Sequence, residues 1–265
     1  MYNEFYGLKV SPFNITSDPQ FFFESSSHKD AYAALLYGIK EKKGIILVTG
    51  EVGTGKTTLC KALLEKLDHE IKVSLILNPY FSEMQLLQAI VEDFGLEIDK
   101  KNRLDIIKKL NSFLIDVNLQ GGNAVLIIDE AQNLTNRQLE QIRLLSNLET
   151  SREKLLQIVL VGQPELVDKL NQFCLRQIRQ RIFIKHDIAP LREEEVRDYI
   201  ELRLKIAGDS GIKILPQSYK LIYEFSRGIP RLINIICDRA LLIGYLREQK
   251  VFDEEIFIAS RKEIE

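Results

Sequence analysis

A glycine-rich loop in residues 44–58 constrains the fold of this chain more than any other segment. The stretch reads GIILVTGEVGTGKTT and contains the pattern G-x-x-x-x-G-K-[ST] without a mismatch. The apolar run 45–48 before the loop is typical of a buried parallel strand, and residues 56–67 after it have a helical pattern. A strand, a glycine-rich turn and a helix in this order form the setting in which the pattern binds phosphate. The motif positions are Gly50, Gly55, Lys56 and Thr57.

The residue types of this loop indicate binding of ATP and Mg²⁺. Glycines allow consecutive backbone N–H groups to point at one phosphate, and the following helix adds the positive end of its dipole. Lys56 is expected to reach the β- and γ-phosphates, and the Thr57 hydroxyl is expected to ligate Mg²⁺. The predicted nucleotide-binding residues are Gly50, Glu51, Val52, Gly53, Thr54, Gly55, Lys56, Thr57 and Thr58.

A second motif, NAVLIIDE at residues 123–130, places two carboxylates after an apolar strand. In open parallel sheets ligands bind at the carboxyl ends of the strands. We expect Asp129 to hold Mg²⁺, through water, and Glu130 to act as the general base that polarises the attacking water. An Asp-Glu pair can also simply begin a helix, but the phosphate loop in the same chain favours the binding role.

Length and composition are those of a packed protein with two parts. The 265 residues suffice for an α/β domain and a smaller second unit, and 45% of them are hydrophobic. The net charge of −2 gives no sign of a surface that coats nucleic acid. Three widely spaced cysteines suit a reducing compartment and suggest neither disulfides nor zinc. Without a recognisable secretory signal or membrane span in the sequence, a cytoplasmic location is expected.

The pattern of elements changes at Pro190. Before it strands and helices alternate, which predicts an α/β domain over 1–190; after it the pattern is purely helical, which predicts a lid over 191–265. The aromatic arm 1–27 is predicted to be irregular, to pack on the first domain and to help wall an adenine pocket. Simple core packing is the alternative reading of its aromatic residues. The other strands are predicted at 71–77, 155–161 and 182–187, and helices at 28–43, 82–94, 103–119, 135–148, 192–207, 216–226, 230–247 and 253–265.

Further candidate site residues lie near element ends. Gln163 follows the strand 155–161 and is a candidate sensor of the γ-phosphate. Arg231, in the helix start Gly-Ile-Pro-Arg, can fold back onto a bound nucleotide. Three arginines before the strand 182–187 are candidates to reach the phosphate of another subunit, although surface solvation or salt bridging is expected for at least one of them. These are Arg176, Arg179 and Arg181.

A basic cluster near residue 100 has two readings. A solvated helix face is favoured, and a nucleic-acid-binding patch is the alternative. The cluster consists of Lys100, Lys101, Arg103, Lys108 and Lys109, interrupted by Asp105.

Taken together, these motifs resemble those of an AAA+ ATPase, and more closely those of the ExeA/GspA family, general secretion pathway protein A, with its pilus-associated MshM-like relatives. The closer resemblance spans the chain and rests on Gly7-Leu8, Pro12-Phe13, Asp18-Pro19, Tyr37-Gly38-Ile39, Gly50 to Thr57, Gly162-Gln163-Pro164-Glu165-Leu166, Gly228-Ile229-Pro230-Arg231 and Ile233-Asn234. Ser17 stands where the family often has Pro, and Gln163 replaces the Asn common at this sensor in AAA+ proteins generally.

The resemblance implies a P-loop AAA+ core with a five-stranded parallel sheet of order 5-1-4-3-2, flanked by helices, and a C-terminal all-helical lid. It further implies ATP hydrolysis, a homo-oligomer formed on ATP binding, and work for a bacterial envelope secretion or pilus machine with a partner at the inner membrane. Family members often continue into a membrane span and a peptidoglycan-binding domain, so this chain is expected to be a cytoplasmic part or a stand-alone relative. The alternatives are a DNA-binding transposition ATPase similar to TniB or MuB, and a nucleotide-gated binding module with slow turnover.

Overall fold

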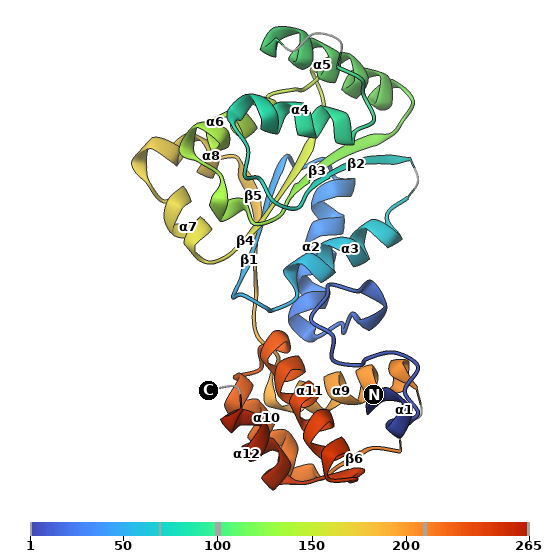
Figure 1. The fold of residues 1–265 in the computed structure, drawn as a ribbon. Helices are drawn as coiled ribbons and strands as arrows, with labels where there is room; N and C mark the ends of the chain where they lie inside the picture. The colour runs from blue at the N-terminus through green and yellow to red at the C-terminus, as the bar shows by residue number, and fades with distance from the viewer. Residues whose placement is uncertain (1, 69, 99–101, 209–210, 264–265) are drawn as a thin grey trace. The chain divides into compact units, whose positions relative to one another are not determined.

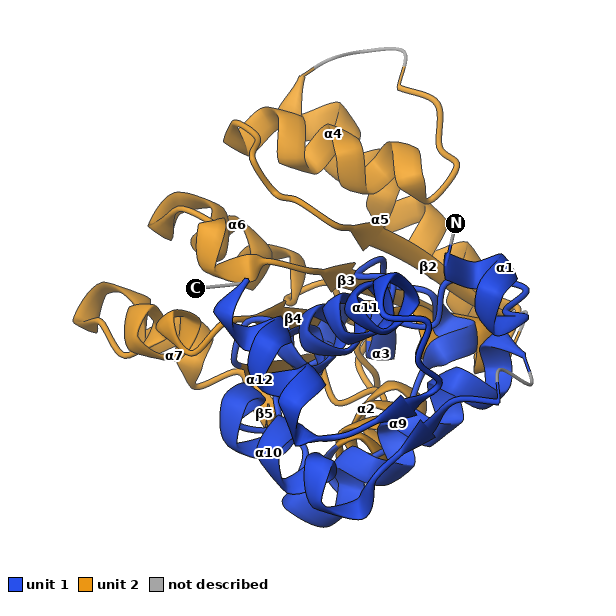
Figure 2. Ribbon diagram, turned by 60° about the horizontal axis from the view of Figure 1, so that its bottom comes forward, with its two compact units in different colours: residues 1–27, 51–59, 189–265 blue, residues 28–50, 60–188 orange. Residues whose placement is uncertain are grey.

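The computed structural model describes residues 2–68, 70–98, 102–208 and 211–263. They form two compact units, each built from separate stretches of the chain (Figure 2). Unit 1 takes its residues from 1–27, 51–59 and 189–265, and unit 2 from 28–50 and 60–188. The proposed division into a nucleotide-binding domain of residues 1–190 and a lid of residues 191–265 stays a prediction.

Unit 2 is built on a five-stranded parallel sheet with the order β2-β3-β4-β1-β5 (Figure 1). This confirms the predicted fold class and strand order. The central strands are buried along their whole length except at half-buried Asn123, as their continuous apolar runs predict for a parallel sheet covered on both faces. The strands are β1 Ile45–Gly50, β2 Ile71–Ile76, β3 Asn123–Ile128, β4 Gln157–Gly162 and β5 Ile182–Ile188.

Helices cover both faces of this sheet (Figure 1). Leu126 and Ile128 of β3 share a core with α4, α5 and α6, while Gly38 of α2 packs closely on Ile46 and Ile184. The helices are α2 Ser26–Lys40, α3 Lys56–Lys66, α4 Glu83–Asp93, α5 Arg103–Leu119, α6 Asn136–Leu145, α7 Glu165–Leu170 and α8 Arg176–Arg179, with 3-10 turns η2 Ala131–Asn133 and η3 Phe173–Leu175. Ser82 and Thr135 form capping boxes at the starts of α4 and α6, which is why these two helix starts could be read from the sequence.

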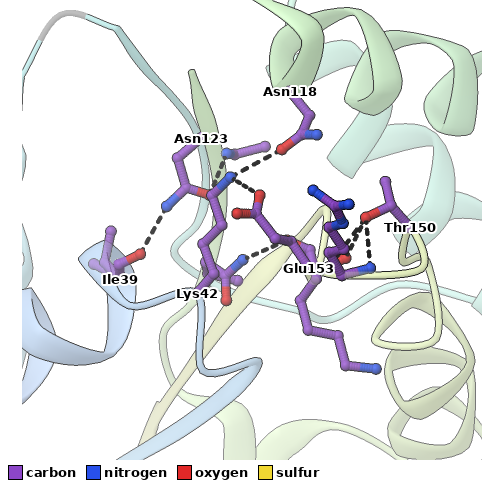
Figure 3. Close-up of polar contacts among 10 residues, drawn as sticks. Ile39, Lys42, Asn118, Asn123, Thr150 and Glu153 are labelled. Carbon is purple, nitrogen blue, oxygen red and sulfur yellow. Dashed lines mark hydrogen bonds and ion pairs between the residues drawn. The ribbon is translucent and has the colours of Figure 1, made fainter. Parts of the chain in front are cut away.

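The amino edge of the sheet is held by side chains from connecting segments (Figure 3). The Lys42 ammonium donates to Asn118 Oδ1 at 2.9 Å and forms an ion pair with Glu153 at 2.5 Å. Gln157, at the start of β4, bridges two more segments, because its Oε1 accepts the Gly44 N–H at 2.8 Å and its Nε2 donates to a backbone carbonyl at 3.1 Å. These contacts fix the sheet at the end opposite to its carboxyl edge.

Unit 1 is mainly helical, and the helices predicted at 192–207, 216–226 and 230–247 start and end within one residue of these ranges. The helix predicted at 253–265 starts at residue 254 and ends at residue 262. The expectation of an entirely helical region overlooks a parallel pair of two-residue strands, which are too short to show any periodicity. The elements of unit 1 are α1 Tyr2–Tyr6, the 3-10 turn η1 Pro19–Phe21, α9 Glu193–Ala207, β6 Lys213–Ile214, α10 Pro216–Ser226, α11 Pro230–Leu246, β7 Val251–Phe252 and α12 Glu254–Lys262. None of the described helices is both long and apolar enough to cross a membrane.

The aromatic arm packs on the C-terminal helices, so the expectation that it packs on the strand-containing part is wrong. Tyr6, Phe13 and Phe21 are buried in the apolar core of unit 1 together with residues of α9, α11 and α12. The arm is also partly helical, since α1 and η1 lie within it. A role for the arm beside an adenine pocket stays a prediction.

Candidate functional site

The phosphate loop begins where β1 ends and has the backbone that its glycines predict. Gly53 and Gly55 have φ angles of +82° and +97°, in the region that L side chains rarely adopt. A Cβ on Gly53 would lie 2.6 Å from the Cβ of Arg231, so this position has no room for a side chain. The loop therefore requires glycine at residue 53 for two separate reasons.

Lys56 opens α3 and is almost fully buried, with 6% of its surface exposed. Its ammonium donates to the Glu51 carbonyl at 2.8 Å, and the Thr54 hydroxyl donates to the same carbonyl at 2.9 Å. The loop thus holds its lysine against its own backbone, beside the positive end of an 11-residue helix. An anion is favoured at this place by the lysine charge and by the helix dipole together.

Arg231 lies in the first turn of α11, within the same unit as the phosphate loop. Its backbone N–H donates to the Gly53 carbonyl at 3.2 Å. The predicted sensor residue is therefore anchored directly on the loop by its main chain. Whether its guanidinium binds the γ-phosphate stays a prediction.

The two acidic residues after β3 differ in environment and conformation. Asp129 is 2% exposed, and its Oδ1 accepts the backbone N–H of Glu130 at 2.9 Å. Glu130 is half-buried and has a left-handed backbone, with φ 51° and ψ 37°. A non-glycine residue held in this region costs roughly 1–3 kcal/mol and is often found where a side chain must be aimed.

The Glu130 carboxylate is held by two glutamine side chains. Gln163 Nε2 donates to Glu130 Oε2 at 3.2 Å, and Gln132 Nε2 donates to the same oxygen. Gln132 Oε1 in turn accepts the backbone N–H of Gln163 at 3.1 Å. The structure thus brings the predicted base and the predicted sensor into contact and adds Gln132, which sequence reasoning missed. The sequence feature that could have indicated Gln132 is a polar residue two positions after the predicted base Glu130.

The order of the strands explains why these residues gather. β3, β4 and β1 are neighbours in the parallel sheet, so their carboxyl ends share one edge. Asp129, Gln163 and Gly50 stand at or directly after these three strand ends. This is the edge at which open α/β sheets bind their ligands.

The three candidate arginines have different surroundings. The Arg176 guanidinium lies 4.6 Å from the ring centroid of Phe173, a side chain that is 79% exposed. Exposed Arg179 donates to Asn171 Oδ1 at 3.2 Å. Arg181 is half-buried. It assists Arg143, whose hydrogen bond is the main cause, in lowering the pKa of the Glu140 carboxyl below its usual value.

The basic cluster is only partly within the described residues, since Lys100 and Lys101 lie outside them. Arg103 and Lys108 are exposed on α5, and Lys109 donates to the Glu97 carbonyl. The exposed members agree with a solvated helix face.

The residues present fit ATP with Mg²⁺. The Thr57 hydroxyl and the Asp129 carboxylate are hard oxygen donors of the kind that Mg²⁺ takes. The side-chain-free cradle at Gly53 and the buried Lys56 suit a phosphate group that approaches the backbone closely.

Comparison with known proteins defines the class. The AAA domain family matches residues 39–170. Among solved structures, Cdc6p from Pyrobaculum aerophilum is similar with a TM-score of 0.69 and 17% identity, covering 98% of this chain and 70% of that one. The ORC1 protein of Aeropyrum pernix in complex with DNA has a TM-score of 0.67 and 17% identity, covering 92% of this chain and 67% of that one. The Thermotoga maritima RuvB Holliday junction branch migration motor has a TM-score of 0.59 and 18% identity, covering 89% of this chain and 69% of that one. The fold is that of an AAA+ protein, and the sequence carries the motif of a phosphate-binding loop.

The family follows from a sequence relative. This chain is 43% identical over 262 residues to general secretion pathway protein A of Aeromonas hydrophila, across 98% of its own length. It belongs to the family of general secretion pathway protein A, which confirms the resemblance. The chain spans about half of that relative, 48% of its length.

Proposed function

We propose that this protein binds ATP with Mg²⁺ and hydrolyses it, and that hydrolysis drives or regulates the assembly of a bacterial envelope secretion or pilus machine. The observation that carries the ATPase part is the Glu130 carboxylate, oriented by two amides at the carboxyl edge of the sheet, in a chain with an intact phosphate loop. A module that only binds nucleotide does not need an oriented carboxylate in this position.

Each residue has a defined task in this proposal. The loop amides and Lys56 bind the β- and γ-phosphates, and Thr57 holds Mg²⁺ together with Asp129, the latter through water. Bound magnesium would neutralise phosphate charge and fix the phosphate geometry. Glu130 accepts a proton from the attacking water, and Gln163 and Arg231 bind the γ-phosphate.

Assembly into a homo-oligomer completes the proposed site. Arg176, Arg179 or Arg181 of one copy would reach the γ-phosphate bound to the next and stabilise charge in the transition state. The exposed positions of Arg176 and Arg179 favour these two over Arg181. The protein would act in the cytoplasm, at the inner membrane through a partner.

The ATPase part is tested by ATP turnover of the purified chain with Mg²⁺ and after addition of EDTA, with Lys56→Ala as the binding-deficient comparison. Turnover that needs both Mg²⁺ and Lys56 is expected, and a chain that binds ATP without turning it over would contradict the proposal. The assembly part is tested in the source bacterium by exchanging Glu130 for Gln on the chromosome and following multimers of the outer-membrane secretin. If secretin multimers form as in the wild type while the variant protein is present at normal levels, ATP hydrolysis does not drive assembly and the secretion part of the proposal is wrong.

A further inference from the structure

We propose that Gln132 is a positioning residue that joins the base Glu130 to the sensor Gln163, so that the two respond to nucleotide as one unit. This inference rests on the proposed ATPase function. Gln132 lies in the 3-10 turn η2, which follows β3 after Asp129 and Glu130, whereas Gln163 directly follows β4. Its side chain therefore connects the ends of two neighbouring strands.

The hydrogen bonds form a closed ring of three residues. Gln132 donates through Nε2 to Glu130 Oε2 and accepts through Oε1 from the Gln163 backbone N–H. Gln163 Nε2 donates to the same Glu130 oxygen and closes the ring. Both ends of the Gln132 amide are thus used, and the group cannot rotate without losing a bond. A rotation of the Gln163 side chain toward a phosphate would change the number of amides on Glu130 from two to one.

The surroundings are built for this amide. A Cβ on Gly162 would lie 2.9 Å from Gln132 Oε1, so the glycine at the end of β4 makes room for it. Lys169 of α7 donates to the carbonyls of Gln132 and Leu134, which fixes the turn that carries the amide. The left-handed backbone of Glu130 further restricts where its carboxylate can point.

In the proposed reaction the two oxygens of the Glu130 carboxylate have different roles. Oε2 accepts both amide N–H groups, which fixes the plane of the carboxylate and assigns Oε1 to the attacking water. Loss of Gln132 should change ATP binding little, because Gln132 contacts the proposed γ-phosphate ligand Gln163 at its backbone N–H and, among the described contacts, touches neither the phosphate loop nor Lys56. It should lower kcat, because a freely rotating carboxylate meets the water less often in the productive orientation.

The chain offers a matched control. Gln157, at the opposite end of β4, also uses both ends of its amide to bridge two segments and is fully buried. Gln132→Met and Gln157→Met each remove two amide hydrogen bonds and keep the side-chain length. We expect about a tenfold or larger fall in kcat for Gln132→Met, with KM and the equilibrium Kd for ATP within about twofold of the wild type. Gln157→Met should lower thermal stability without this fall in kcat.

Two further measurements separate positioning from general damage. In Gly162→Ala the added Cβ would lie 2.9 Å from both Gln132 Oε1 and Leu166 Cδ2, so the variant should displace the Gln132 amide and lower kcat, and its thermal stability is measured beside kcat. In the double variant Gln132→Met/Gln163→Met, the combined loss should be smaller than the product of the single losses, since both amides act on one oxygen. Independent, multiplicative losses would contradict a coupled unit.

A test without nucleotide keeps the inference separate from the proposed function. In the nucleotide-free protein, Gln132→Met should shift the backbone amide resonance of Gln163, and Glu130→Ala should shift the side-chain amide resonances of both glutamines. If these resonances do not move, or if Gln132→Met keeps wild-type kcat while Glu130→Gln is inactive, the positioning role is wrong and the ATPase assignment stands. If the resonances move but the wild type does not hydrolyse ATP, the proposed function fails while the ring remains.

Discussion

At the scale of single residues, the contact between Gly53 and Arg231 links the phosphate loop to the start of α11. The Gly53 carbonyl accepts the Arg231 N–H, and the close approach of the two residues excludes any side chain at position 53. A nucleotide phosphate bound by the loop would therefore lie near the origin of the Arg231 side chain. The proposed role of Arg231 as a sensor that distinguishes ATP from ADP rests on this contact.

Removing the Arg231 guanidinium should weaken ATP binding more than ADP binding. We expect Arg231→Ala to raise the Kd for ATP about tenfold, the effect of losing a hydrogen bond to a charged group, and to leave the Kd for ADP nearly unchanged. Equilibrium titration with both nucleotides checks this. Gly53→Ala is the comparison, since it disturbs the loop itself and should weaken both nucleotides alike. Equal losses for ATP and ADP in Arg231→Ala would mean that the side chain only packs.

At the scale of elements, Arg203 of α9 fastens the N-terminal arm to the helices of unit 1. Arg203 is 6% exposed, and its guanidinium donates to the carbonyls of Pro12 at 2.6 Å and Asn14 at 3.2 Å and lies 4.7 Å from the ring centroid of Phe21. Tyr199 also contacts it, 3.3 Å from Nη1. One side chain from α9 thus satisfies backbone acceptors of an arm that has few of its own helical hydrogen bonds.

Replacing Arg203 should destabilise this unit and release the arm. We expect Arg203→Leu to lower the free energy of unfolding by about 2–3 kcal/mol, because the carbonyl of buried Pro12 and the carbonyl of Asn14 lose a charged donor. Urea denaturation measures the loss, and hydrogen exchange should increase in residues 8–16. Arg197→Leu on the same helix is the control, because that arginine is exposed and its ion pair with Glu201 is screened by solvent, so its loss should change stability little. Similar losses in both variants would contradict the fastening role.

At the scale of the whole molecule, the sequence predicts the sheet and the long helices well and the short elements poorly. β1, β3 and β4 are continuous apolar runs with polar motifs at their ends, and α4 and α6 carry capping residues. Such signals are local and strong. By contrast, α1, α7 and the pair β6 and β7 have two to six residues, too few for a period to appear.

Some residues of the candidate site could likewise be predicted from the sequence and others could not. The loop residues, Asp129 and Glu130 could be read from the sequence because their motifs are contiguous. Gln132 could not, because its importance arises from Gln163, 31 positions further along the chain. The surface on which the aromatic arm packs was mispredicted for the same reason, since its partners in α9, α11 and α12 are distant in sequence. Periodicity shows that a residue is buried but does not identify what covers it.

A site completed by an arginine of a second copy predicts turnover that depends on protein concentration. An arginine supplied by a neighbouring subunit increases the rate of phosphoryl transfer roughly 10³–10⁵-fold, so a monomer should be slow and specific activity should rise on self-association. Mixing Glu130→Gln subunits with subunits that lack both exposed arginines, Arg176 and Arg179, should restore some turnover, because an intact Glu130 can use the arginine of its neighbour. If demonstrated mixed oligomers stay inactive and specific activity is flat over a wide concentration range, the arginines do not act in trans.

The role of Glu130 as the base is tested by comparing ATP binding and ATP turnover in the wild type and in Glu130→Gln. The substitution keeps the shape of the side chain and removes its capacity to accept a proton. Because general-base catalysis contributes roughly 10²–10⁴ in rate, kcat should fall by at least about 10²-fold while the Kd for ATP stays close to the wild-type value. Wild-type turnover in Glu130→Gln would contradict the assignment of Glu130 as the base, and with it the account of this site as a hydrolytic centre.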